Sequence, residues 1–313
     1  PPRSGDIVAI ACCRRSGNPF RQLMPFRRRS FHRILLSLIP VLWGFGMNAQ
    51  GQLRTALEVR SLGYTEAEAG QPVELTGVAI FVDPPSTIFI QDETAGSFFR
   101  LENRVPPRPG DAVRVTGRTF PGLYLPGIEE CTFEVLGHQG LPTARAATYD
   151  DLMSGRYHYQ RVAVEGVVRT VSPDEENASI ARIALGTRII EVQVEEAPGA
   201  RAFVDCRVRI SGLAAGHIND RRQLVDPYLR CGGWSEFAVL QTAPDLAAVP
   251  MISTEQMLTF DVAGQGGHRV RVAGTVLASF PTGELFIRDE AAAVVVHLLA
   301  QDAVLQAGDR IVL

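Results

Sequence analysis

The stretch Phe89-Ile90-Gln91-Asp92-Glu93 recurs later in the chain as Phe286-Ile287-Arg288-Asp289-Glu290. In each copy the aspartate follows a glycine, Gly77 or Gly274, by fifteen residues. A more divergent copy, Val162-Ala163-Val164-Glu165-Gly166, matches Val73-Glu74-Leu75-Thr76-Gly77. The spacing of the three glycines, about 90 to 110 residues, is that of a small domain. The repetition therefore indicates three tandem copies of one fold.

Each copy shows the period-2 alternation of a half-buried strand. Residues 72–77 and 111–117 alternate apolar with polar side chains, and Pro/Ser/Asp-rich segments such as 83–86 and 172–176 separate the strands. A helix-start signal precedes each block, with a hydroxyl residue followed three positions later by an acid or amide, at Thr55, Thr148 and Ser253. We expect a mainly β protein of tandem OB-like barrels, each with a short N-terminal cap helix. A β-sandwich is the competing architecture, which periodicity does not exclude.

The repeated glycines and aspartates are interpreted as structural. Gly77, Gly166 and Gly274 each close an alternating strand, where a small barrel needs a sharp bend. Asp92 and Asp289 end a strand, where an aspartate commonly starts a turn by bonding to its own backbone.

The amino-terminal region differs from the repeats. A basic segment, 27–33, precedes a mostly apolar run, 34–46, and the three residues that follow end in a small one, Ala49. These zones predict a signal peptide at 24–49, with 1–23 as an upstream, non-structural segment, whereas the short run with Pro40 makes a membrane span the weaker interpretation. The repeats are then expected at 53–141, 142–250 and 251–313, the last truncated. The mature protein is expected on the periplasmic or extracytoplasmic side of a bacterial membrane.

Charge bears on the partner. From Leu53 onward, 23 arginines stand against 33 acidic residues, a formal net charge of −10, and the chain has no lysine. OB-type barrels that bind single-stranded nucleic acid use a basic groove. We therefore expect a small ligand or a periplasmic protein as partner and not nucleic acid. Membrane contact is expected only through the signal segment or a helix downstream.

The polar residues suggest no catalytic or metal centre. Cys131, Cys206 and Cys231 follow the signal segment without a CxxC pair, and the six histidines lack metal-ligand spacing. Cys206 and Cys231 either form a disulfide or are buried thiols. No catalytic residue, metal or cofactor is predicted.

Aromatic side chains in the first repeat are more numerous than its core requires. Alternation places Phe89 and Gln91 on the face opposite Ile88 and Ile90, and adjacent phenylalanines at 98 and 99 cannot both point inward. Two interpretations stay open: a ligand-stacking platform and packing of the core and of neighbouring repeats. The ligand-binding candidates are Phe89, Gln91, Phe99 and Tyr124.

Two segments suggest a family. Residues 55–62 with 73–78, and Asp151-Leu152-Met153-Ser154-Gly155-Arg156 with residues 162–169, resemble the exported sensory region of bacterial two-component sensor histidine kinases. The resemblance covers about residues 53–313 and implies that a membrane helix, a dimerisation domain and an ATPase domain follow. This chain carries no phospho-acceptor histidine segment and no asparagine-rich ATP lid. Kinase activity is therefore not expected of it.

Two functions from different classes follow. The first is a non-catalytic, extracytoplasmic sensory region, the input part of a sensor histidine kinase. The second is an exported OB-fold module accessory to a secreted hydrolase or nuclease. Neither interpretation makes this chain itself an enzyme.

Overall fold

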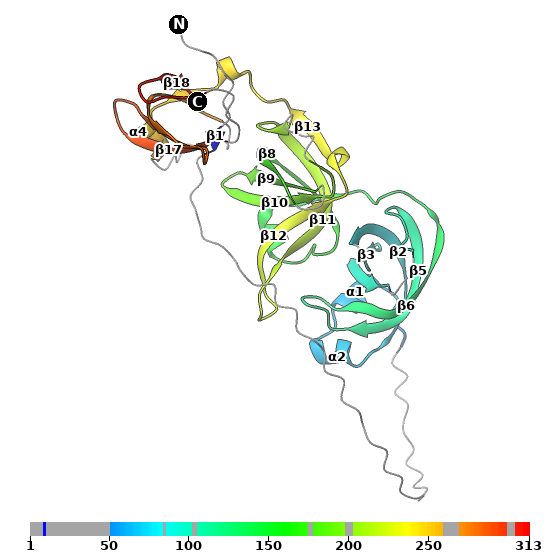
Figure 1. Ribbon diagram of the computed structural model, residues 1–313. Coiled ribbons are helices and arrows are strands. Elements are labelled where there is room, and N and C mark those ends of the chain that lie inside the picture. The colour runs from blue at the N-terminus through cyan, green and yellow to red at the C-terminus, as the bar shows by residue number, and fades with distance from the viewer. Residues whose placement is uncertain are drawn as a thin grey trace, which may run out of the picture. The chain divides into compact units, whose positions relative to one another are not determined.

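The computed structural model describes residues 9–10, 51–83, 86–101, 105–174, 178–197, 203–258, 269–298 and 304–313. The predicted signal peptide, 24–49, lies outside these residues, as does most of the predicted upstream segment, 1–23. The chain divides into two compact units, Gln50–Ile252 with Gln256–Arg271, and Ser253–Glu255 with Val272–Leu313 and strand β1 (Figure 1). Each unit is described separately.

The first repeat is a closed five-stranded barrel. Its elements are helices α1 (Ala56–Arg60) and α2 (Tyr64–Glu68) and strands β2 (Pro72–Asp83), β3 (Thr87–Gln91), β4 (Gly96–Arg100), β5 (Asp111–Phe120) and β6 (Gly127–His138). The strands follow the order β2-β3-β4-β6-β5, and β5 pairs with β2 to close the barrel. The β4–β6 pair is parallel, and the other pairs are antiparallel.

The long strand β2 turns the corner of this barrel. Its first half pairs with β5 and its second half with β3, and the register shifts between Ala79 and Phe81. Val73 and Leu75 point into the core with Ile88, Ile90 and other apolar residues, as the alternation predicts. Beyond the register shift Ile80 and Phe81 are buried in a separate cluster outside that core. The barrel therefore buries apolar side chains on both of its faces.

The second repeat has the same connectivity. Its elements are β7 (Arg145–Ala146), α3 (Tyr149–Met153), β8 (Arg161–Pro173), β9 (Ser179–Leu185), β10 (Arg188–Val194), β11 (Arg207–Ile218), β12 (Leu224–Cys231), the 3-10 turns η3 (Trp234–Glu236) and η4 (Leu246–Ala248), and β13 (Phe237–Gln241). The path β8-β9-β10-β12-β11 becomes a ring because β11 also pairs with β8. Strands β10 and β12 are parallel, as are the corresponding strands β4 and β6. Strand β13 extends the sheet from β11.

The third repeat contains the first four strands of this pattern. A short strand, β14 (Met251–Ile252), precedes its other elements, which are α4 (Thr254–Leu258), β15 (Arg271–Ser279), β16 (Glu284–Arg288), β17 (Ala293–Leu298) and β18 (Arg310–Val312). Strand β16 lies between β15 and β17, and β18 pairs with β15. Strand β1 (Ala9–Ile10) pairs with β17, so two residues of the segment predicted to be non-structural are part of this sheet. Val276, Leu285 and Ile287 are buried in the third repeat.

These arrangements identify the fold class. The chain is mainly β, and in the first two repeats strand one pairs with strand four while strands three and five run parallel, which is the connectivity of an OB barrel. The closed rings exclude the β-sandwich for both repeats. Helices α1, α3 and α4 precede the strands as predicted, and Thr55 and Thr148 form the predicted capping boxes with Glu58 and Asp151.

The repeated glycines lie where two strands approach closely. A Cβ atom added to Gly77 would lie 2.6 Å from the Gln91 carbonyl oxygen, and one added to Gly166 would lie 2.5 Å from that of Ala184. At Gly274 the corresponding distance to the neighbouring strand is 3.1 Å. None of the three glycines has a positive φ. These positions are therefore restricted to glycine by contact with the neighbouring strand. The expected cause, a sharp bend with an unusual backbone conformation, is not what the structure shows.

The repeated aspartates connect each cap helix to a hairpin. Asp92 Oδ1 accepts hydrogen bonds from the backbone amides two and three residues further on, and Oδ2 accepts one from Ala56 at the start of α1, 2.7 Å away. Asp289 repeats this pattern, with Oδ2 accepting from the Thr254 amide of α4 at 2.7 Å. Hydrogen bonds from the Thr254 hydroxyl and from backbone amides hold the pKa of Asp289 well below its usual range. The repeated aspartates thus start a turn, as the sequence predicts, and in addition each holds the first turn of a cap helix.

Candidate functional site

An aromatic cluster joins the first barrel to the second repeat. Phe81, Phe89 and Phe98 form a cross-strand row over β2, β3 and β4. The ring of Tyr159, from the second repeat, lies 5.0 Å from Phe89 and 5.2 Å from Phe98 between centroids. Leu213 of β11 is buried in the same cluster. We call this contact the aromatic junction. It covers the outer face of strands β3 and β4 of the first barrel.

The backbone at the junction is closely packed. A Cβ atom at Gly96, the first residue of β4, would overlap the carbonyl group of Tyr159. Tyr159 has φ 65°, in the left-handed region that costs a non-glycine residue about 1–3 kcal/mol. The contacts around Tyr159 hold it in that conformation, which identifies the junction as a specific packing of one repeat on the other.

Polar contacts extend the junction. Arg60 of α1 donates hydrogen bonds to the carbonyl oxygens of His158, at 3.2 Å, and Gly155, at 3.0 Å. The Arg222 guanidinium, at the tip of the β11–β12 hairpin, donates to the Pro121 carbonyl at 2.8 Å. His158 is buried, and burial together with the charge of Arg60 lowers its pKa to about 3. The imidazole is therefore neutral at physiological pH.

The predicted ligand-binding residues lie at the junction or in the core. Phe89 belongs to the aromatic junction, and Gln91 accepts a hydrogen bond from the Arg161 amide at 2.7 Å. The Tyr124 ring lies 4.8 Å from that of His158. Phe99 is completely buried inside the first barrel, which leaves no surface for a ligand and corrects its assignment as a binding residue. For the other three the structure favours packing between repeats, and ligand stacking stays a prediction.

A cavity of about 420 Å³ opens beside the junction. One wall comes from helix α1 and the β3–β4 hairpin of the first repeat, and the other from β7 and the segment that follows α3. The lining residues are Leu57, Arg60, Thr94, Ala95, Arg145, Arg156, Tyr157 and Gln160. Three of these eight side chains are arginines and none is acidic, although the region from Leu53 onward has a net charge of −10.

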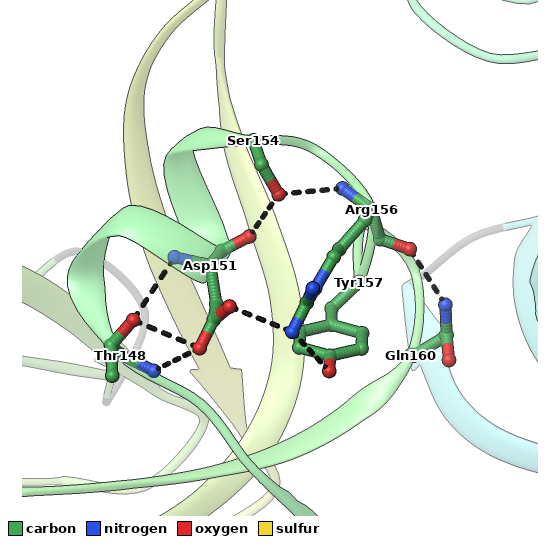
Figure 2. Close-up of polar contacts among 6 residues, drawn as sticks. All are labelled: Thr148, Asp151, Ser154, Arg156, Tyr157 and Gln160. Atoms are coloured by element: carbon green, nitrogen blue, oxygen red, sulfur yellow. Dashed lines mark hydrogen bonds and ion pairs between the residues drawn. The ribbon is translucent and has the colours of Figure 1, made fainter.

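Local hydrogen bonds determine the shape of one wall (Figure 2). The Ser154 hydroxyl donates to the carbonyl of Asp151, at 2.7 Å, and accepts from the Arg156 amide at 3.3 Å. Gln160 Nε2 donates to the Arg156 carbonyl at 3.0 Å. The segment after α3 is therefore a defined loop that presents Arg156 and Tyr157 together.

The arginines of the cavity surround Tyr157. The Arg156 guanidinium lies 4.4 Å above the Tyr157 ring and donates to its hydroxyl at 2.7 Å, and the Arg145 guanidinium lies 5.4 Å from the same ring. Both distances are within the range of cation–π attraction. Arg156 also pairs with Asp151 at 2.8 Å (Figure 2). Burial lowers the pKa of Arg60, but its ordinary value of 12.5 is high enough that the group is charged at neutral pH.

The unpaired positive charge is concentrated on Arg145. Among the residues that the structure describes, none accepts a hydrogen bond from Arg145 or pairs with it as a carboxylate. Arg60 uses its donors on uncharged carbonyl groups. Within the described ranges, Arg156 is the one arginine of the three that pairs with an acidic side chain, so the lining of the cavity carries a net positive charge.

Sequence reasoning missed this cavity. Arg60 and Arg156 lie in segments that carried the family resemblance, but no feature of the sequence shows that they meet. The basic-aromatic run Arg156-Tyr157-His158-Tyr159-Gln160 was the available signal. In a chain with 31 arginines and no lysine, a single arginine in such a run does not stand out.

The two cysteines with a predicted bridge are not bonded to each other. The Cys231 thiol donates to the Ser211 carbonyl at 3.2 Å, and the Cys206 sulfur accepts from the Ala243 amide at 3.2 Å. Both side chains are buried in the core of the second barrel, where burial raises the pKa of Cys231. Of the two alternatives left open by the sequence, a disulfide and two buried thiols, the structure has the buried thiols.

In the part of the chain that the structure describes, His, Cys, Asp and Glu side chains form no group of three or more that could hold a metal ion. Over the same residues, no helix has both the length and the apolar composition needed to span a membrane.

Comparisons with known proteins give structural likenesses at low identity. No protein-family model and no curated protein matches the chain. A murine DNA-binding protein bound to double-stranded DNA is 13% identical, with a TM-score of 0.29, over 56% of this chain and 97% of that one. The Ifi202 HINa domain in complex with double-stranded DNA is 10% identical, with a TM-score of 0.28, over the same shares. A replication protein A heterotrimer bound to single-stranded DNA is 8% identical, with a TM-score of 0.26, over 76% and 79%.

The strand order, rather than these scores, defines the class: a protein of tandem OB-like barrels. The comparisons correct one expectation, that nucleic acid is not a partner, because these structures are described with bound DNA. The expectation rested on net charge, which is a sum over the whole chain. Binding depends on local charge, and the arginines of the cavity show that an acidic chain can still present a basic site.

Proposed function

We propose that this chain is a non-catalytic binding module and serves as the extracytoplasmic input region of a signal-transducing protein, a two-component sensor histidine kinase. The observation that carries the binding role is the positively charged cavity between the first two repeats. The resemblance of residues 55–62 and 151–156 to sensory regions of such kinases supports the signalling role. In this proposal the cavity receives the ligand, and the barrels hold its walls.

The proposal also places the chain in the cell. Residues 24–49 direct export, and the repeats at 53–141, 142–250 and 251–313 face the periplasm or the cell exterior. The partner binds at the positively charged cavity, and a helix downstream of the repeats connects them to the membrane.

Two experiments test the proposal. The gene beyond codon 313 should encode a membrane span followed by dimerisation and ATPase domains. A stop codon or a hydrolase or nuclease domain there would contradict the sensor role and favour the accessory-module alternative.

The second experiment concerns export. Residues 24–49, fused to a reporter enzyme that is active only outside the cytoplasm, should give activity. A matched fusion with Leu35→Arg and Leu36→Arg interrupts the apolar run and should give none. Equal activity of the two fusions, or no activity of either, would refute export by this segment.

A further inference from the structure

The cavity has the features of a site for a particular class of ligand. Its volume of about 420 Å³ lies within the range of about 300–1,000 Å³ that is usual for small-molecule sites. Guanidinium groups bind carboxylates and phosphates through two parallel hydrogen bonds, so arginines are common where planar anions are recognised. Leu57 and Ala95 add an apolar portion to the wall.

The three charges reach the cavity from different elements. Arg60 belongs to α1 of the first repeat, Arg145 to β7, and Arg156 to the loop after α3. Arg60 is held by its bonds to the Gly155 and His158 carbonyls, and Arg156 by Asp151 and the Tyr157 hydroxyl. These two guanidinium groups are thus oriented before any ligand arrives, and less ordering entropy is lost when one binds.

Arg145 is the group that a ligand would engage most directly. It is exposed, stacks on Tyr157, and has no carboxylate partner among the described residues. An anion beside it would neutralise a charge that the described part of the protein leaves uncompensated. A ligand with one anionic group could satisfy Arg145 alone, whereas a ligand with two could also reach Arg60 across the cavity.

We infer that the cavity binds a small organic or inorganic polyanion, with at least two carboxylate or phosphate groups, held between Arg60 on one side and Arg145 and Arg156 on the other. This inference rests on the proposed binding role and adds the chemical class of the ligand. Because the ligand bridges the two repeats, its binding stabilises the junction as well as the cavity.

Isothermal titration of the purified chain at constant ionic strength tests the inference. Citrate probes for a polycarboxylate, pyrophosphate for a phosphorylated ligand, glucose serves as an uncharged probe, and a short oligothymidylate probes for nucleic acid. The variant is Arg145→Gln, because among the described residues the Arg145 side chain contacts only the Tyr157 ring, at 5.4 Å. The matched control is Arg114→Gln on β5, which removes the same charge from a surface pair with Glu134.

We expect citrate or pyrophosphate to bind, with affinity about tenfold or more weaker in Arg145→Gln and unchanged in Arg114→Gln. Whichever of the two anions binds more tightly identifies carboxylate or phosphate as the preferred group. Three results would overturn the inference: no binding of either anion, equal weakening in both variants, or binding of glucose as tight as that of the anions.

Tighter binding of the oligothymidylate, weakened by Arg145→Gln, would overturn the small-molecule assignment in favour of nucleic acid. A result that refutes a polyanionic ligand can be distinguished from a result that refutes the proposed function. Glucose binding would retain a binding module with an uncharged ligand, and the gene and export experiments do not depend on the ligand.

Discussion

The close packing at Gly96 gives the sharpest test of the aromatic junction. A methyl group at this position would overlap the backbone carbonyl of Tyr159, so Gly96→Ala must separate the two repeats or shift a backbone. Forced overpacking of this kind costs about 1–3 kcal/mol. The matched control is Gly232→Ala, where an added Cβ has no heavy atom within 4 Å and φ is not positive. That change should be neutral or slightly stabilising, because alanine restricts the unfolded chain.

Urea unfolding of residues 50–313, in which Trp234 is the one tryptophan, is followed by fluorescence and by circular dichroism. With an m value of about 2–3 kcal/mol/M, a loss of about 1–3 kcal/mol lowers the midpoint by about 0.3–1.5 M. Trp234 lies in the second repeat, whereas Gly96 lies in the first. A lowered midpoint at Trp234 would thus show that the two repeats unfold together. Identical midpoints for Gly96→Ala and Gly232→Ala would refute the junction.

Gly77→Val should lower the urea midpoint by the equivalent of about 1–3 kcal/mol, since its Cβ would meet the Gln91 carbonyl, and an unchanged midpoint would show that the strands have room there. His158 has a folded pKa of about 3 against about 6.5 when unfolded, so protonation favours the unfolded chain and stability should fall as pH drops below about 6.5. The thermal midpoint of His158→Gln should fall less between pH 7 and pH 5, and a parallel fall would exclude this residue as the cause. Alkylation of the unfolded, unreduced chain should label Cys206 and Cys231, and a peptide linking the two would contradict the structure.

Much of the fold was predictable because its determinants are local. Alternation within 72–77 reports directly which side chains enter the barrel, and the capping boxes at Thr55 and Thr148 lie within four residues of chain. The adjacent phenylalanines behaved as alternation requires. Phe99 is in the barrel core and Phe98 is outside it, in the aromatic junction.

The junction and the cavity could not be predicted in the same way. Alternation shows that Phe98 points out of the barrel, but it does not show whether water or another domain covers it. Arg60 reaches carbonyl groups 95 and 98 residues further along the chain. Contacts at that separation depend on how two finished barrels dock, for which the sequence has no periodic signal. Gly77 is an intermediate case. The sequence predicts that this glycine has a structural role, but it does not show that the role comes from the close approach of the Gln91 carbonyl.

The division of the cavity wall has a consequence for protein engineering. Helix α1 contributes Arg60 and the second repeat contributes Arg145 and Arg156, so neither repeat contains the cavity by itself. The site exists only where the two barrels dock in this arrangement. Transplanting either repeat alone into an unrelated protein would therefore leave the binding site behind.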